Sequence, residues 1–228
     1  MSVRLPGLAV LGAVAAAIAS AAWVAVAPEH SGLPLLLAAM GLIVAGAAWL
    51  ETGSGASKEI VLVATLAAVA AAGRVLFAAI PGVQPVTVIV VAAGAALGAR
   101  AGFATGALAA LASNFFLGQG PWTPWQMLGW GLCGLAGAAL GPLLRGRVSF
   151  AAVCFVLGFA FSAMMDVWLW VAFFPHTWQA LTVVMAQGFW YEAAHAIGNV
   201  AIALAIGPEL RRLLERYARS LRTEVVWA

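Results

Sequence analysis

Charged residues are scarce in this chain of 228 residues. They make up 8% of it, whereas hydrophobic residues make up 64%. In a soluble domain of this size, about a quarter of the residues are charged. Because this chain cannot form such a surface, we expect lipid to surround most of it. Backbone groups in lipid must be hydrogen-bonded within the chain, so the sequence predicts an all-α integral membrane protein.

Lysine is nearly absent, since Lys58 is the only one in the chain. A P-loop needs a lysine after a glycine-rich turn, and Lys58 does not stand in such a sequence. Any ATP-driven step must therefore be carried out by another subunit. The net charge of +3 comes from scattered arginines and not from one basic face, so nucleic acid is not an expected partner.

Cysteine is also rare, with Cys133 and Cys154 as its only examples. Both lie inside apolar segments, where a free cysteine behaves as a small hydrophobic residue. No second soft ligand lies near either of them in the sequence, so neither a disulfide nor a metal site is expected.

Eight apolar segments follow one another along the chain. Crossing the hydrocarbon core takes about 20 helical residues, and most of the segments reach that length. The fourth and fifth are shorter and flank Gly98 and Gly102, so we expect a tight pair or tilted, partly buried helices. The segments cover residues 7–27, 33–50, 59–80, 84–99, 101–117, 124–144, 148–174 and 180–206.

The arginines predict how these segments are oriented. With the N-terminus in the cytoplasm, no basic residue falls in an outer loop, which is the positive-inside pattern. The first segment is too long for a signal peptide and is expected to be retained. Residues 209–222 continue as a basic, amphipathic helix, either on the inner membrane surface or simply solvated. The residues placed inside are Arg4, Lys58, Arg100, Arg145, Arg147, Arg211, Arg212, Arg216, Arg219 and Arg222.

Four ionisable residues fall at membrane depth: Arg74, Asp166, Glu192 and His195. Each is costly to expose to lipid, so we expect them to face the interior and to pair with one another. Arg74 could pair with either Asp166 or Glu192. Such a pair could merely hold helices together, or it could form the floor of a substrate cavity that opens to the outside.

Glu192 and His195 share one helix face, because they stand three residues apart. This spacing is half of a carboxylate-bridged metal site, but the second copy that such a site needs is missing. We therefore expect no metal and interpret the two residues as part of a polar seam. No nucleophile signature is present either. An intramembrane enzyme that uses Glu192 and His195, or a structural assembly protein, stays an alternative.

Residues 114–126 form the most unusual loop of the chain. They combine amides, glycines, prolines and indoles without a single charge. Rigid aromatic surface beside neutral donors and acceptors is typical of a ligand site. The candidate binding residues are Asn114, Gln119, Trp122, Thr123, Trp125 and Gln126 in the loop, Arg74 and Asp166 beneath it, and Glu192 and His195 on the last segment.

A stripe of small residues runs along the segment 59–80, where Ala64, Ala68 and Ala72 recur every four residues. Small residues at this spacing allow a second helix to approach closely within a membrane. The stripe is either internal packing or a docking face for another membrane subunit.

Several sequence motifs resemble the substrate-binding S components of energy-coupling factor (ECF) transporters. They are GRVLFAAIPGVQPVT at 73–87, GFATG at 102–106, SNFF at 113–116, GQGPWTPWQM at 118–127 and AHAIGN at 194–199. The Gly-Pro pair at 207–208 and the arginine-rich tail are similar too. The similarity covers about residues 58–220, and the pattern looks most like the members assigned to cobalamin.

The resemblance implies a six-helix substrate-binding membrane domain at 58–207, a two-helix N-terminal extension at 1–57 and a basic cytoplasmic tail helix at 208–228. It implies a subunit of the cell membrane that captures a micronutrient outside and is not itself an enzyme. Such a subunit holds no cofactor, because its partners, a membrane T component and two ATPase subunits, hydrolyse the ATP. The small-residue stripe of the family contacts the T component, which corresponds here to Ala64, Ala68 and Ala72.

Overall fold

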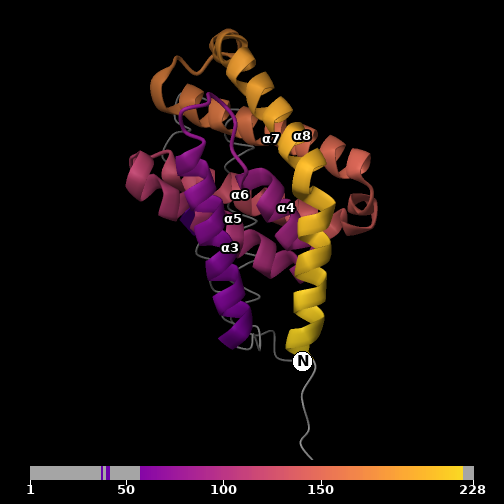
Figure 1. The fold of residues 1–228 in the computed structure, drawn as a ribbon. Helices are drawn as coiled ribbons and strands as arrows, with labels where there is room; N and C mark the ends of the chain where they lie inside the picture. The colour runs from indigo at the N-terminus through magenta and orange to yellow at the C-terminus, as the bar shows by residue number, and fades with distance from the viewer. Residues whose placement is uncertain (1–36, 38–39, 42–56, 223–228) are drawn as a thin grey trace, which may run out of the picture.

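The computed structural model describes residues 37, 40, 41 and 57–222 of the protein. Within 57–222 the chain forms six α-helices and one short 3-10 helix, with no strand, so the prediction of an all-α fold is confirmed for this part (Figure 1). Nearly all of the predicted extension at 1–57, and the chain after residue 222, lie outside the described residues. The helices are α3 (Ser57–Leu76), α4 (Val86–Leu97), α5 (Ala99–Leu117), α6 (Thr123–Ala139), η2 (Gly141–Arg145), α7 (Arg147–Phe173) and α8 (Trp178–Arg222).

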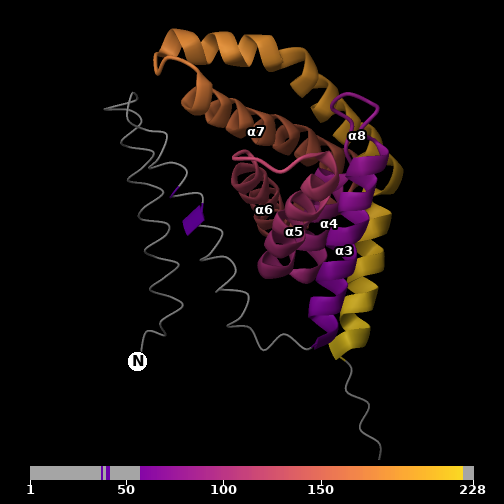
Figure 2. The same cartoon turned by 90° about the vertical axis from the view of Figure 1, so that its left-hand side faces the viewer.

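Three of the described helices are long and apolar enough to cross a membrane. Their spans are Glu59–Leu76, Arg147–Phe173 and Trp178–Ser220. Helix α4 is apolar but has only 12 residues, which is about 18 Å of helix and less than the hydrocarbon thickness. The turn after α3 and the turn between α7 and α8 lie at the same end of the molecule, at the top of Figures 1 and 2.

Helix α4 is the centre of the fold. Every residue from Val86 to Gly94 is buried, and α4 contacts α3, α5, α6, α7 and α8. A helix that is apolar on all sides is stable only when other elements surround it. The chain turns back at once at Gly98, whose φ of 98° is readily adopted by glycine alone, and α5 begins at the next residue. The short fourth and fifth segments therefore form the expected tight pair.

Glycines bring α4, α5 and α6 into backbone contact. A Cβ atom added to Gly94 would lie 1.9 Å from the carbonyl oxygen of Gly134, and one added to Gly102 would lie 2.6 Å from the Cα of Gly94. On α6, a Cβ atom at Gly137 would lie 2.3 Å from the carbonyl oxygen of Val91. Such close approach replaces the hydrophobic effect as the source of helix association in lipid.

Helices α7 and α8 pack along each other and extend beyond this compact group. In Figure 2 the first part of α8 lies with α7 across the top of α4–α6, and the rest bends toward the opposite end. The predicted tail from residue 208 is continuous with α8, which contains Pro208 and runs to Arg222.

Arg147 compensates for the proline in α8. A proline has no N–H, so Pro208 leaves the carbonyl of Leu204, four residues earlier, without its helical donor. The Nη1 of Arg147 donates to that oxygen at 2.6 Å, and its Nη2 contacts the carboxylate of Glu209. Arg147, at the start of α7, thus supplies the hydrogen bond that α8 lacks at Leu204.

The predicted alanine stripe faces outward. Ala64, Ala68 and Ala72 are exposed on α3, whereas Ala67 and Ala70 are buried against the rest of the bundle. Internal packing of α3 within the described part of the chain therefore uses the neighbouring alanines and not the stripe.

We predict that Gly94→Ala destabilises the protein by about 1–3 kcal/mol, because its methyl group would overlap backbone atoms that have no room to move. The measurement is the thermal melting temperature of the detergent-purified protein. Gly141→Ala is the matched control, since its Cβ would meet only one atom, the Ala95 carbonyl oxygen at 3.9 Å. Equal melting temperatures for the two variants would contradict the backbone contact.

We also predict that Arg147→Ala lowers the melting temperature of the wild-type protein but has a much smaller effect when Pro208 is replaced by alanine. In the Pro208→Ala background the helix regains its own donor to Leu204, so Arg147 is no longer required there. A double-mutant cycle measures the difference. A purely additive cycle would show that Arg147 does not compensate for the proline.

Candidate functional site

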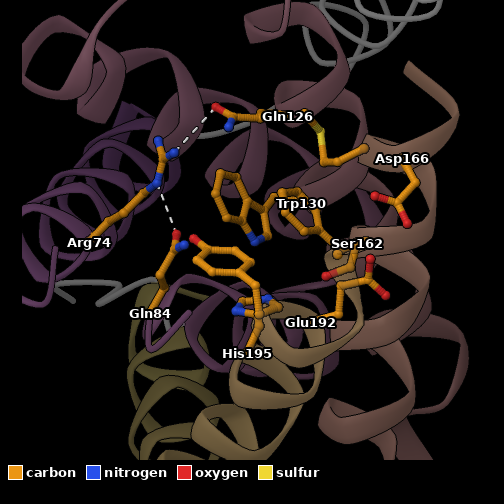
Figure 3. A pocket seen from close by; sticks show the side chains of 12 residues that line it. Arg74, Gln84, Gln126, Trp130, Ser162, Asp166, Glu192 and His195 are labelled. Atoms are coloured by element: carbon orange, nitrogen blue, oxygen red, sulfur yellow. Dashed lines mark hydrogen bonds between the residues drawn. The ribbon is translucent and has the colours of Figure 1, made fainter. Parts of the chain in front are cut away.

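A cavity of about 230 Å³, lined by both polar and apolar side chains, lies between the helices of the bundle. Its walls come from α3, α6, α7 and α8 and from the turn that precedes α4 (Figure 3). A basic wall contains Arg74, Gln84 and Gln126. The opposite, acidic wall contains Asp166 and Glu192, and aromatic rings lie between the two walls.

Arg74 organises the basic wall. This buried guanidinium donates through Nε to Gln84 Oε1 at 2.9 Å and through Nη1 to Ser113 Oγ at 2.7 Å and Asn114 Oδ1 at 2.6 Å. Its Nη2 makes a longer contact of 3.4 Å with Gln126 Oε1. One side chain of α3 is thereby bonded to α5, to α6 and to the turn before α4.

The expected ion pair of Arg74 is not formed. Among the residues that the structure describes, no carboxylate lies within 4.0 Å of its guanidinium, and Asp166 and Glu192 stand across the cavity (Figure 3). The physical reason is that neutral side-chain oxygens already accept hydrogen bonds from most of the N–H groups of Arg74. A cation can be held this way because amide and hydroxyl oxygens carry partial negative charge, and charge-assisted hydrogen bonds are strong.

Trp130 forms the aromatic floor of the cavity. Its indole is fully buried, and Nε1 donates to Thr87 Oγ1 at 3.2 Å. The ring stacks on Phe161 with centroids 4.3 Å apart, and the guanidinium carbon of Arg74 lies 4.8 Å from the ring centroid. The second contact is a cation–π interaction, which adds to the stabilisation of the buried charge.

Asp166 and Glu192 form the acidic wall, from α7 and α8. Both side chains are buried, with 8% and 7% of their surface exposed. A Cβ atom added to Gly188 would lie 2.5 Å from Glu192 Oε1 and 3.3 Å from Asp166 Oδ1, so both carboxylates lie against the same glycine. Asp166 Oδ2 and Glu192 Oε1 have no hydrogen-bond partner, although buried polar atoms normally find one.

His195 fixes the turn that closes one side of the cavity. Its Nδ1 lies 2.7 Å from the carbonyl oxygen of Gly82, which can only accept, so Nδ1 carries the proton. Its Nε2 then accepts from Asn199 Nδ2 at 3.3 Å. Gly82 has a φ of 76°, and a Cβ atom there would lie 2.9 Å from the carbonyl oxygen of Tyr191. Nδ1 of His195 therefore holds the turn on α8, and Nε2 is occupied by Asn199 of the same helix.

The predicted loop residues mostly stabilise the loop itself. Asn114 Nδ2 donates to Thr123 Oγ1 and to Gln126 Oε1, both at 2.9 Å, and Thr123 Oγ1 donates to Gln119 Oε1 at 2.9 Å. Gln119 Nε2 also donates to the carbonyl of Leu111 at 3.1 Å. This chain of bonds closes the turn between α5 and α6, and only Gln126 among these residues also lines the cavity.

Neither tryptophan of the loop lines the cavity. Trp125 is buried in a cluster with Phe103, Ala107 and Leu128. Trp122 is half-buried and meets Trp168 edge-on, with ring centroids 6.1 Å apart. Of the candidate binding residues, the cavity thus brings together Arg74, Gln126, Asp166, Glu192 and His195, and it leaves out Asn114, Gln119, Trp122, Thr123 and Trp125.

Seven lining residues are not among those proposed from the sequence: Gln84, Trp130, Phe161, Ser162, Met165, Gly188 and Tyr191. Helical spacing could have found four of them, because each stands four residues from a proposed residue on the same helix: Trp130 from Gln126, Ser162 from Asp166, Gly188 from Glu192 and Tyr191 from His195. Tyr191 is the neighbour of Glu192. Gln84 stands between two prolines in the turn before α4, and only the folded turn shows that it faces Arg74.

A second cavity of about 330 Å³ adjoins the first. It lies under the turn 77–84, and Arg74, Gln84 and Tyr191 line both cavities. These three side chains therefore separate the inner cavity from the space under the turn.

The described residues contain no group of three or more His, Cys, Asp or Glu side chains that could hold a metal ion. No protein-family model matches the chain, and searches of curated proteins and of solved structures find no match. The class that fold and site define is an α-helical protein with segments able to cross a membrane and, between its helices, a cavity that contains ionisable side chains. Its function is inferred from the site itself.

Proposed function

We propose that the protein is the substrate-binding membrane subunit of an ATP-driven importer of a micronutrient, of the ECF S-component type. One observation carries the proposal: a cavity lined by arginine, carboxylates, amides and aromatic rings lies within a bundle that has membrane-length helices. Ionisable residues at membrane depth are costly, and they mark substrate pathways when they face a cavity. The sequence motifs that resemble S components point to the same function.

The size of the cavity bears on the ligand. Small-molecule sites are typically about 300–1,000 Å³ in volume, and the inner cavity of about 230 Å³ suits a compact, flat molecule. Cobalamin, which the resemblance favours, is much larger. Even joined to the space under the turn, which is about 330 Å³, the inner cavity would not enclose it, so cobalamin would require a wider opening than the structure shows.

The proposed orientation puts both ends of the chain in the cytoplasm of a cell whose plasma membrane the subunit spans several times. The positive-inside distribution of arginines supports it. In that orientation the turn 77–85 and the turn 118–122 face outward, above the cavity. The ligand would then enter from outside, past the turn that His195 holds.

The exposed stripe of Ala64, Ala68 and Ala72 is the proposed docking face for a membrane T component. Small side chains let a partner helix approach closely, and the stripe is not used for packing within the described part of the chain. Two ATPase subunits would bind the T component and hydrolyse the ATP, and the subunit itself would be no enzyme.

Two alternatives fit the site less well. An enzyme that uses Glu192 and His195 needs a free ring nitrogen for proton transfer, whereas both nitrogens of His195 are engaged. A purely structural assembly protein would have no need of buried carboxylate oxygens without partners, which are costly to maintain.

A thermal-shift screen with a panel of vitamins tests the binding function. We expect one compound to raise the melting temperature of the detergent-purified protein, because a ligand of the folded state stabilises it by mass action. Gln126→Ala should then weaken binding at least tenfold, since Gln126 lines the cavity. Trp122→Ala is the matched control and should bind normally, because its side chain packs on Trp168 outside the cavity. If Trp122→Ala lost binding and Gln126→Ala did not, the binding site would lie in the loop and not in the cavity.

Ala68→Leu tests the docking face. We expect this variant to fold and to bind its ligand, but to lose ATP-dependent uptake in cells that express the whole transporter, because leucine prevents close helix approach. Ala70→Leu is the contrasting variant and should fail to fold, since Ala70 is 0% exposed. Normal uptake by Ala68→Leu would show that the stripe is not a docking face.

A further inference from the structure

The acidic wall of the cavity lacks a countercharge. Asp166 and Glu192 lie against the same glycine, Gly188, and each keeps one buried oxygen without a hydrogen-bond partner. Two carboxylates at such close range repel each other unless a proton or a cation lies between them. We propose that this wall binds a cationic nitrogen, a protonated amine or a positively charged heterocycle, on the ligand.

No residue that the structure describes supplies the missing charge. Arg74 is the one arginine that lines the cavity, and its guanidinium is bonded to Gln84, Ser113 and Asn114 on the opposite wall. His195 is also committed, because its ring nitrogens bond Gly82 and Asn199. Either a proton shared by the two carboxyl groups or a positive charge from outside the described chain must therefore relieve the repulsion.

A metal ion fits this wall less well than an organic cation. Zinc and calcium ions normally have three or more protein ligands, and the described residues hold no such group of His, Cys, Asp and Glu side chains. The aromatic surroundings favour a flat organic group instead, because Trp130 and Phe161 border the same cavity and aromatic faces attract cations.

The ligand that this arrangement fits has a ring and two polar ends. The ring would lie beside Trp130 and Phe161, and its cationic nitrogen would lie at Asp166 and Glu192. A carbonyl or carboxylate at the other end would face Arg74 and Gln126. This inference rests on the proposed binding function and narrows its ligand to a compact cation or zwitterion, in place of a neutral, amide-rich corrinoid.

The test uses two probes of nearly equal shape, benzylamine and benzyl alcohol, which differ in charge at neutral pH. Both are small enough for the inner cavity, since a cavity of about 150 Å³ can hold benzene. Their dissociation constants for the full-length protein are measured by ligand-observed NMR in deuterated detergent. The variants are Asp166→Asn/Glu192→Gln, Glu192→Gln alone and, as a charge-matched control outside the cavity, Glu215→Gln.

We expect benzylamine to bind the wild type at least tenfold more tightly than benzyl alcohol, because hydrogen bonds to a charged group are the stronger ones. The preference should vanish in the double variant, shrink in Glu192→Gln and persist in Glu215→Gln. The substituted residues have nearly the same shape as the originals, so we expect the variants to fold. If the double variant is not recovered, the preference for benzylamine in Glu192→Gln alone is the test.

Equal binding of the two probes to the wild type would overturn the inference, and so would a preference that survives in the double variant. A vitamin that stabilises the protein while the probes show no charge preference would sustain the proposed function and refute only the cationic subsite. A charge preference with no stabilising vitamin would sustain the subsite and count against the micronutrient.

Discussion

The buried guanidinium of Arg74 is the interaction on which the site depends. It joins α3 to Gln84 in the turn before α4, to Ser113 and Asn114 on α5 and to Gln126 on α6. Because neutral oxygens satisfy most of its donors, the charge is accommodated without consuming a carboxylate. Had Arg74 paired with Asp166 or Glu192, the two walls would meet and the cavity would close. The cavity stays open because Arg74 donates its hydrogen bonds to neutral side-chain oxygens and not to the carboxylates on the other side.

The fold supplies the rigidity that such an arrangement needs. Backbone contacts at Gly94, Gly102 and Gly134 fix α4, α5 and α6 as one compact group. These contacts set where Ser113, Asn114 and Gln126 stand, and hence where Arg74 is held. The acidic wall comes from α7 and α8, which pack mainly against each other. The basic wall and the acidic wall thus belong to different parts of the bundle, with the aromatic rings between them.

The sequence predicted the helices well and the site only in part. Apolar runs and prolines located each described helix, because lipid leaves the backbone few other options. It also identified Arg74, Asp166, Glu192 and His195, since ionisable residues in apolar segments are conspicuous. The partners of Arg74 could not be predicted, because charge favours a carboxylate whereas packing brings amides from three other elements. Likewise, the composition of the loop 114–126 gave no indication that Asn114, Gln119 and Thr123 bond one another. The direction of the side chains of Trp122 and Trp125 depends on the start of α6, which composition alone does not determine.

The central claim is that the cavity between Arg74 and the acid pair holds a small molecule. Native mass spectrometry of the protein released from lipid nanodiscs, prepared directly from the membranes of its own cells, tests this claim most directly. The account predicts one low-mass adduct per chain, which gentle conditions preserve and which is separate from the ladder of bound lipids. A spectrum that contains the lipid adducts but no other low-mass adduct of the chain would contradict it.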